Sequence, residues 1–230
     1  MAQLTGQERA TYVQSIFARI AQRYNRMNRL MTGGQDIQWR RQVIKLAQMD
    51  NSASLLDLGT GTGDLAREAA RRFPQAKIIA SDFTLEMMHV GKRISPLNFS
   101  AADALKLPFD DLSFDAVISG FLMRNVINLD DAVAEQYRVL KDGGRIVILD
   151  TTRPERNILS PLIWTYMHFI IPAIGKLLTG TSEPYRYLPK STEEFVTSED
   201  MAARMEKAGF KNINFKRYMV GTIAIHWGEK

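Results

Sequence analysis

Residues 57–64 form a glycine-rich turn of a type that holds nucleoside ligands. The turn reads Asp-Leu-Gly-Thr-Gly-Thr-Gly-Asp and follows a short apolar run. Gly59, Gly61 and Gly63 permit a tight passage from strand to helix and let a ligand approach bare backbone. Asp64 stands where a dinucleotide-binding turn carries its third glycine, and no Gly-Lys-Ser or Gly-Lys-Thr is present. Pyrophosphate and triphosphate binding are therefore the less favoured interpretations.

Two carboxylates farther along the chain are placed to hold the same ligand. Asp82 ends the second apolar run, where nucleoside-binding sheets carry a carboxylate that accepts both ribose hydroxyls. Asp103 and Ala104 follow the third run, where a carboxylate and a backbone N–H can meet the edge of an adenine. Together with the turn, these positions predict an adenosine across the strand ends. A simpler interpretation stays open, in which the glycines only form a turn and Asp82 caps the helix that begins near Phe83.

Between residues 54 and 149, short apolar runs alternate with amphipathic helical patterns, which is typical of a parallel sheet covered on both faces. The expected strands are 54–58, 77–81, 98–102, 116–119 and 145–149, with helices at 64–73 and 130–140 among those between them. After a helix at 198–208, runs at 212–217 and 222–227 are spaced as an antiparallel pair. We therefore expect an α/β, Rossmann-like, doubly wound and mainly parallel sheet of seven strands with an antiparallel C-terminal strand, plus N-terminal helices and a helical lid.

The N-terminal segment 1–48 is predicted to form basic helices that are broken at Thr32-Gly33-Gly34, with the last helix at 36–48. The chain has 30 Lys plus Arg against 25 Asp plus Glu, a net charge of +5. Residues 1–46 hold eight basic and two acidic side chains, so this segment carries +6. A membrane surface, a nucleic acid or an acidic ligand would complement that charge, although a solvated helix face also accounts for it.

Residues 157–175 contain no Asp, Glu, Lys or Arg and are long enough to span a bilayer. Pro161, His168 and Pro172 would each need a partner inside lipid, so we expect a broken helix that is buried or lies at an interface. The segment belongs to an insertion at 157–190 within a single domain, 1–230.

The absence of cysteine excludes disulfides, thiolate zinc sites and a cysteine nucleophile. The three histidines suggest no metal site. No apolar stretch follows a basic start at the N-terminus, so we expect no secretory signal and a cytoplasmic location.

Several motifs resemble those of Rossmann-like methyltransferases that use S-adenosylmethionine. They are 57–64, Asp82, 107–109 with 113–115, and 138–144. Further segments are similar to the menaquinone and ubiquinone C-methyltransferases, and the similarity runs from about Tyr12 to the C-terminus. These segments are 12–17, 23–28, 123–126, 185–188 and 225–228.

The resemblance implies an S-adenosylmethionine-dependent enzyme that methylates a ring carbon of a polyprenylated quinol, either demethylmenaquinol or a related benzoquinol. The residues expected to bind the cofactor are Asp57, Gly59, Gly61, Thr62, Asp82, Phe83, Asp103, Ala104 and Gly120. The chain departs from the family pattern at Thr60-Gly61, where two adjacent glycines are usual, and at Gly120, where a serine is common.

Arg124 and Asn125 directly follow the fourth strand, and the resemblance assigns them to orienting and stabilising an ionised quinol. Arg124 stays protonated and is an electrostatic stabiliser rather than a base, although a salt bridge at the strand end is the alternative. Other candidates for contact with the substrate or closure over the site are Tyr24, Tyr185, Arg186, Tyr187 and His168, the last as a base. Ordinary packing is the alternative for the tyrosines.

Other functions remain open at this point. Residues 119–122 lack the Asn/Asp-Pro-Pro-aromatic signature of exocyclic amine methylation, so we expect no nucleic-acid partner. A methyltransferase of another phenolic or amphipathic small molecule is the main alternative, followed by a non-catalytic cofactor-binding module. Peripheral contact with an anionic membrane is expected, and the oligomeric state is open, a homodimer included.

Overall fold

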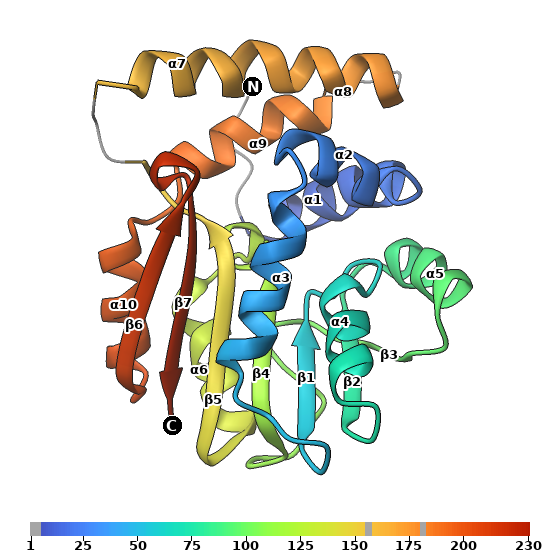
Figure 1. Cartoon of the computed structure of the whole chain (residues 1–230), viewed down its shortest axis with the longest axis vertical. Helices are drawn as coiled ribbons and strands as arrows, with labels where there is room; N and C mark the ends of the chain where they lie inside the picture. The colour runs from blue at the N-terminus through green and yellow to red at the C-terminus, as the bar shows by residue number, and fades with distance from the viewer. Residues whose placement is uncertain (1–5, 155–157, 180–182) are drawn as a thin grey trace.

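A computed structural model describes residues 6–154, 158–179 and 183–230. Its described strands form one seven-stranded sheet in the order β3-β2-β1-β4-β5-β7-β6 (Figure 1). They are β1 Ser54–Leu58, β2 Lys77–Asp82, β3 Asn98–Ala101, β4 Phe114–Gly120, β5 Leu140–Thr151, β6 Lys211–Tyr218 and β7 Ile223–Glu229. The first five pair in parallel, and β7 pairs antiparallel with both β5 and β6. The predicted α/β class and doubly wound sheet are therefore confirmed.

The strand order reverses at β1, which pairs with β2 on one side and β4 on the other. The loops that follow β1 and β4 therefore lead away from each other, to opposite sides of the sheet. Their divergence leaves a crevice at the carboxyl ends of these two strands. Leu55, Leu56 and Leu58 are fully buried, as expected of a central strand that is covered on both faces.

Helices cover both faces of the sheet. On one face, α3 Gln35–Leu46 and α4 Asp64–Arg72 contribute to a core with apolar residues of β1, β4 and β5. On the other face, α6 Leu129–Val139 and α10 Ser198–Lys207 complete a second core. The helix α5 Leu85–Ile94 lies beside β2 and β3. These layers hold the strand ends in fixed positions beneath the site.

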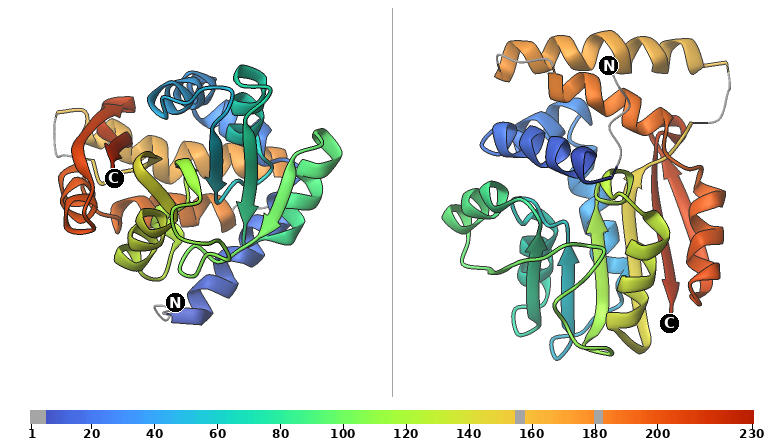
Figure 2. Two further views of the ribbon diagram at one scale, coloured as in Figure 1. Left: turned by 90° about the horizontal axis from the view of Figure 1, so that it is seen from below. Right: turned by 180° about the vertical axis from the view of Figure 1, so that it is seen from behind.

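A cap of helices lies above the carboxyl ends of the strands (Figures 1 and 2). Its N-terminal part is α1 Gly6–Ile20 and α2 Tyr24–Met31, and its other part is α7 Ser160–Thr165, the π-helical turn η2 Tyr166–Ile170, α8 Ile171–Thr179 and α9 Glu183–Glu193. The π turn precedes Pro172, whose missing N–H removes a helical hydrogen bond, so the helix that was expected to be broken here instead continues from Ser160 to Thr179 through a local irregularity. Within the described ranges, no helix is long and apolar enough to cross a bilayer.

Strand β5 begins at Leu140, five residues before the predicted strand. Asp142-Gly143-Gly144 has the composition of a turn, and Gly143 does adopt a φ of +74°. Nevertheless Leu140 pairs with Phe114 ahead of an irregularity in the β4–β5 register, which places the glycines inside the strand. Composition alone does not distinguish such an irregular strand from a loop.

Gly91 lets α5 pack closely beneath the glycine-rich turn. A Cβ at this position would lie 2.7 Å from the carbonyl oxygen of Thr62 and 2.5 Å from Cζ of Phe99. We predict that Gly91→Ala lowers the free energy of unfolding by about 1–3 kcal/mol through overpacking, as measured by urea denaturation. Lys92→Ala, at the next and exposed helical position, is the matched control. Equal unfolding midpoints for the two variants would contradict this account of the packing.

Candidate active site

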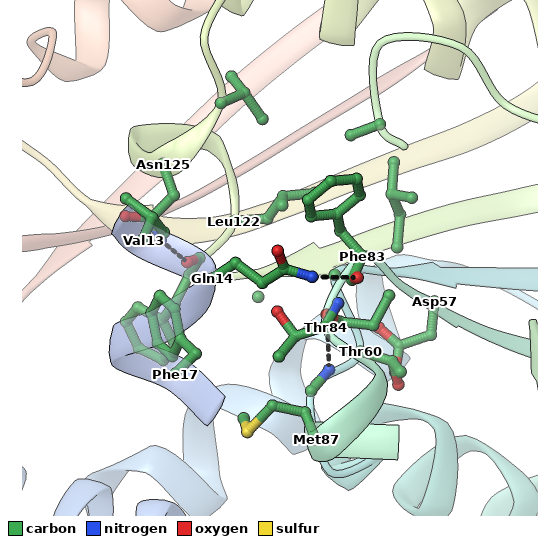
Figure 3. Close-up of a pocket in the computed structure, with 18 of the residues that line it drawn as sticks. Val13, Gln14, Phe17, Asp57, Thr60, Phe83, Thr84, Met87, Leu122 and Asn125 are labelled. Atoms are coloured by element: carbon green, nitrogen blue, oxygen red, sulfur yellow. Dashed lines mark hydrogen bonds between the residues drawn. The ribbon is translucent and has the colours of Figure 1, made fainter. Parts of the chain in front are cut away.

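Two cavities adjoin at the carboxyl ends of β1, β2 and β4. The first is lined by the glycine-rich turn, the end of β2 and helix α1 (Figure 3). The second has a volume of about 540 Å³ and is lined mainly by apolar side chains of α1, α2, α7 and α9. The residues that line both cavities are Phe17, Tyr24, Asn28 and Phe121. A ligand in one cavity therefore lies next to a ligand in the other.

The glycine-rich turn uses backbone conformations that favour glycine. Gly59, Gly61 and Gly63 have φ values of +67°, +60° and +88°. A Cβ on Gly59 would lie 2.9 Å from Cδ1 of Leu122, so the turn also packs against the segment after β4. The prediction that these glycines form a tight passage from β1 to α4 is confirmed.

Asp82 braces this turn. One carboxylate oxygen accepts a hydrogen bond from the Gly61 amide, and the other accepts one from the Thr84 amide, both at 2.7 Å. Burial raises the pKa of Asp82. The carboxylate also lines the first cavity, and each of its oxygens keeps acceptor capacity for a ligand. Asp82 is thus positioned to fix the turn and to contact a ligand at the same time.

Asp57 places a buried acceptor beside the first cavity. Its Oδ2 accepts hydrogen bonds from Oγ1 of Thr60 at 2.5 Å and from the Ala66 amide at 2.9 Å. Its Oδ1 is buried without a hydrogen-bond partner among the described residues. Burial raises the pKa of Asp57 to about 7. An acceptor of this kind suits a cationic group on a ligand.

The N-terminal helices hold the rim of the first cavity. Gln14 Nε2 donates to the carbonyl of Phe83 at 3.2 Å (Figure 3). Asn25 accepts from Oγ1 of Thr62 at 3.0 Å and donates to Oδ1 of Asp64 at 3.1 Å. Neither Gln14 nor Asn25 was predicted as a site residue from the sequence. Asn25 stands within the motif at 23–28, which is the signal that could have identified it.

The other residues predicted for the cofactor also line the first cavity. Asp103 is exposed, and its Oδ1 accepts from the Leu105 amide at 2.9 Å, while Ala104 is buried. Phe83 is 44% exposed at the cavity mouth. A Cβ on Gly120 would lie 2.9 Å from Cδ1 of Leu65, which leaves little room for the serine that is common at this position. The structure therefore brings the predicted cofactor residues together.

Arg124 lies in the wall of the second cavity. Its Nη1 donates to Oδ1 of Asp150 at 2.5 Å, and its guanidinium stands 5.3 Å from the centroid of the Phe121 ring. Nε is buried without a partner among the described residues. The salt bridge and the cavity-facing position are thus both present. Asp150, twenty-six residues away, was not predicted.

Asn125 connects the segment after β4 to the cap. Its Nδ2 donates to the carbonyl of Phe121 at 3.0 Å, and its Oδ1 accepts from the hydroxyl of Tyr187 at 3.0 Å. Asn125 lines the first cavity, whereas Tyr187 lines the second. Tyr185 also lines the second cavity and packs closely against Gly175. The side chain of Arg186 lies outside the described part of the chain.

Tyr24 lies at the junction of the two cavities, and its ring meets that of Phe17 edge-on at 5.8 Å between centroids. Burial raises the pKa of Tyr24, while the charge of Arg124 acts in the opposite direction. The hydroxyl is therefore neutral near pH 7.

His168 lines neither cavity. Its ring stacks on Trp164 at 4.7 Å, and its Nε2 lies 3.5 Å from Oε1 of Glu193. The structure does not bring it together with the other candidates.

The second cavity contains further polar atoms that are buried without partners in the described ranges. They are Nδ2 of Asn28, Oγ1 of Thr151 and Oγ1 of Thr192. Isolated polar side chains in apolar surroundings carry no periodic signal, and they were not predicted. In residues 6–154, 158–179 and 183–230, no group of three or more His, Asp or Glu side chains could hold a metal ion.

The model of the ubiE/COQ5 methyltransferase family matches residues 4–230. The chain belongs to this family. A Desulfotalea psychrophila protein named ubiquinone/menaquinone biosynthesis C-methyltransferase UbiE is 42% identical over 95% of this chain and 90% of its own length. A Roseiflexus castenholzii demethylmenaquinone methyltransferase is 39% identical over 97% and 95%. Membership confirms the predicted S-adenosylmethionine-dependent methyltransferase activity.

Solved structures agree with the fold. Phosphoethanolamine N-methyltransferase 2 of Haemonchus contortus, in complex with S-adenosyl-L-methionine, has a TM-score of 0.64 at 16% identity and covers 84% of this chain and 52% of its own. The [4+2]-cyclase SpnF has a TM-score of 0.70 at 16% identity over 98% and 96%. At such identities the likeness concerns the fold alone.

The raised pKa of Asp57 predicts an unusual pH dependence of stability. Between about pH 4 and pH 7 the unfolded chain has lost the Asp57 proton and the folded chain keeps it, so this group makes the ligand-free protein less stable as pH rises. The contribution is on the order of 4 kcal/mol across that window. Urea unfolding of the protein and of Asp57→Asn at a series of pH values isolates it, because other groups titrate equally in both. Parallel pH profiles for the two proteins would show that Asp57 titrates normally.

Proposed function

We propose that the protein transfers a methyl group from S-adenosylmethionine to a ring carbon of a polyprenylated quinol, either demethylmenaquinol or a related benzoquinol. The observation that carries the proposal is the shared wall between the cavity at the glycine-rich turn, which Asp57, Asp82 and Asp103 line, and an apolar cavity of about 540 Å³. The names of the relatives, which refer to ubiquinone and menaquinone biosynthesis, support it.

The first cavity suits S-adenosylmethionine in the charge and hydrogen-bonding groups of its lining. Asp82 would accept the ribose hydroxyls, Asp103 and the Ala104 amide would meet the adenine edge, and the unpartnered Oδ1 of Asp57 would face the ammonium group. Gly61 leaves the backbone open to close approach. When bound, the cofactor supplies a methyl group on a positively charged sulfur.

A ring carbon of a quinol is a weak nucleophile unless the neighbouring hydroxyl is ionised. A phenol titrates near pH 10, so ionising it at pH 7 costs about 4 kcal/mol without help from the protein. Arg124 Nε and Asn28 Nδ2 are buried donors in the wall of the second cavity, and they would stabilise the anion. Asp150 holds the Arg124 guanidinium in place.

The rest of the second cavity suits a quinol with an isoprenoid tail. Thr151 and Thr192 offer hydroxyls for the other quinol oxygen. Apolar side chains would line the tail, including Ile16, Ile20, Met27, Leu159, Ile163, Met167 and Ile171. Because Phe17 and Phe121 line both cavities, they would exclude water where donor and acceptor meet, which aligns the two for direct transfer.

A substrate of this kind is a lipid, so we propose that the protein works at the inner face of a membrane as a peripheral protein. The exposed Arg26 of α2 would favour contact with anionic lipid, whereas Arg19 and Arg29 are exposed but paired with Glu183 and Asp36.

Methyl transfer can be tested with methyl-labelled S-adenosylmethionine and a lipid extract that contains desmethyl quinones kept reduced. We expect the label in the quinone fraction, and none in a reaction that lacks the extract. Label in a water-soluble phenol would favour the alternative small-molecule methyltransferase. No transfer, combined with intact cofactor binding, would favour a non-catalytic binding module.

Replacement of Asp82 tests the cofactor site. Because Asp82→Ala removes a ribose acceptor and frees the Gly61 amide, we predict at least about tenfold weaker binding of S-adenosylhomocysteine by calorimetry. Asp142→Ala, at an exposed position within β5 away from the cavities, is the control. Unchanged affinity in a folded Asp82→Ala protein would refute the assignment.

Replacement of Arg124 tests stabilisation of the quinol anion. We predict that Arg124→Gln lowers kcat about 100- to 1000-fold while S-adenosylhomocysteine binds almost as before, since the lost donor acts on the developing charge. Arg124→Lys keeps the positive charge but loses the planar, forked set of donors. Its kcat should therefore lie between those of the parent protein and of Arg124→Gln. A change confined to KM would assign Arg124 to substrate binding alone.

A further inference from the structure

The segment α7–η2–α8 forms a helical rod at the outer edge of the cap, on the side away from the sheet (Figures 1 and 2). Residues 158–179 contain no Asp or Glu, and Lys176 is their only Lys or Arg. The inner side of the rod packs through Met167 and Ile171 against Met27 and Tyr185. A helix with an apolar inner side ordinarily turns a polar side to solvent.

The outer side of this rod is apolar as well. Ile158, Leu162, Phe169 and Leu177 are 93%, 68%, 61% and 85% exposed. Within the rod, Leu162, Phe169 and Leu177 are spaced by seven and eight residues, which places them on one side of the helix, and Ile158 lies just before α7. Trp164, which is 50% exposed, adds an aromatic side chain of the type that favours membrane interfaces. An exposed apolar stripe of this extent indicates an interaction surface.

We propose that this outer face, with Phe169 and Leu177 at its centre and end, inserts into the interfacial layer of an anionic membrane leaflet. The rod would lie parallel to the membrane rather than across it. The choice of a membrane as the partner of this face rests on the proposed quinol methylation. It is supported by the charge near the face and by the connection of the face to the second cavity.

Charge on the α2 side of the rod favours anionic lipid. The exposed Arg23 and Arg26 lie at the start of α2, which contacts α8, and Lys176 is exposed on the rod itself. Each well-placed cation near such a surface contributes about 1 kcal/mol to attraction.

The second cavity reaches the same surface. Leu159 and Leu162 line this cavity, and they are also 42% and 68% exposed. A tail in the cavity would therefore have a continuous apolar path along the rod to the acyl chains. Docking in this orientation delivers a long-tailed quinol without passing its tail through water.

Vesicle flotation tests the docking directly. We expect the protein to bind vesicles of phosphatidylcholine with about a third phosphatidylglycerol more tightly than phosphatidylcholine alone, and to lose that preference in high salt. Phe169→Ser combined with Leu177→Ser should lower partitioning by about tenfold or more. Neither residue lines a cavity. Ile94→Ser combined with Leu112→Ser, at exposed apolar positions outside the cap, is the matched control and should bind as the parent does.

Activity separates a failure of docking from a failure of the proposed function. The rod variant should methylate a water-soluble quinol without a tail at the parental rate, but a long-tailed quinol in vesicles more slowly. Vesicle binding with no quinol methylation at all would refute the proposed function and leave docking intact. The docking proposal would be overturned if the parent protein bound neither type of vesicle or if the rod variant bound vesicles as well as the parent does. It would also be overturned if the parent protein formed a dimer that the variant failed to form.

Discussion

Methyl transfer from a sulfonium to an ionised quinol consumes two opposite charges, and this constraint accounts for the arrangement of the site. Each charge needs a partner before the reaction, yet water must stay out of the contact between donor and acceptor. Several buried polar atoms without partners border the two cavities. Asp57 Oδ1, an acceptor, borders the first and would face the ammonium group of the cofactor, the donor Arg124 Nε borders the second, and the donor Asn28 Nδ2 lies where the two cavities meet. Such atoms cost about 1–3 kcal/mol each when unpaired, so their presence at this junction is best explained by ligands that complete them.

The sheet supplies the rigid half of the site, and the helical cap covers it. Asp82 ties the glycine-rich turn to the end of β2 through backbone amides, so the first cavity keeps its shape without ligand. Within the cap, α2, α8 and α9 share a small apolar core, whereas α1 and α9 are joined by exposed contacts such as the 2.9 Å ion pair between Arg19 and Glu183. An ion pair of this kind contributes little to stability. Separation of α9 from α1 is therefore inexpensive, which suits a cavity that must admit a lipid substrate.

Much of the fold could be predicted from sequence, because alternating strands and helices leave a periodic pattern. The glycine-rich turn and Asp82 were predictable for a related reason, since each follows a strand directly. The partners that complete the site were not predictable in this way. Asp150 meets Arg124 across twenty-six residues, and Asn25 reaches Thr62 across thirty-seven. Contacts between distant segments have no local signature in the sequence. For the same reason the sequence could not show that His168, a candidate because of its place in the lid segment, lines neither cavity.

The central claim is that cofactor and quinol meet at the wall formed by Phe17, Tyr24, Asn28 and Phe121. A crystal structure with both S-adenosylhomocysteine and a short-tailed quinol tests it most directly. The account predicts adenosine at the glycine-rich turn, the quinol ring beside Arg124, and the sulfur facing a ring carbon across that wall. A quinol bound elsewhere, or a ring with only its oxygen directed at the sulfur, would contradict it.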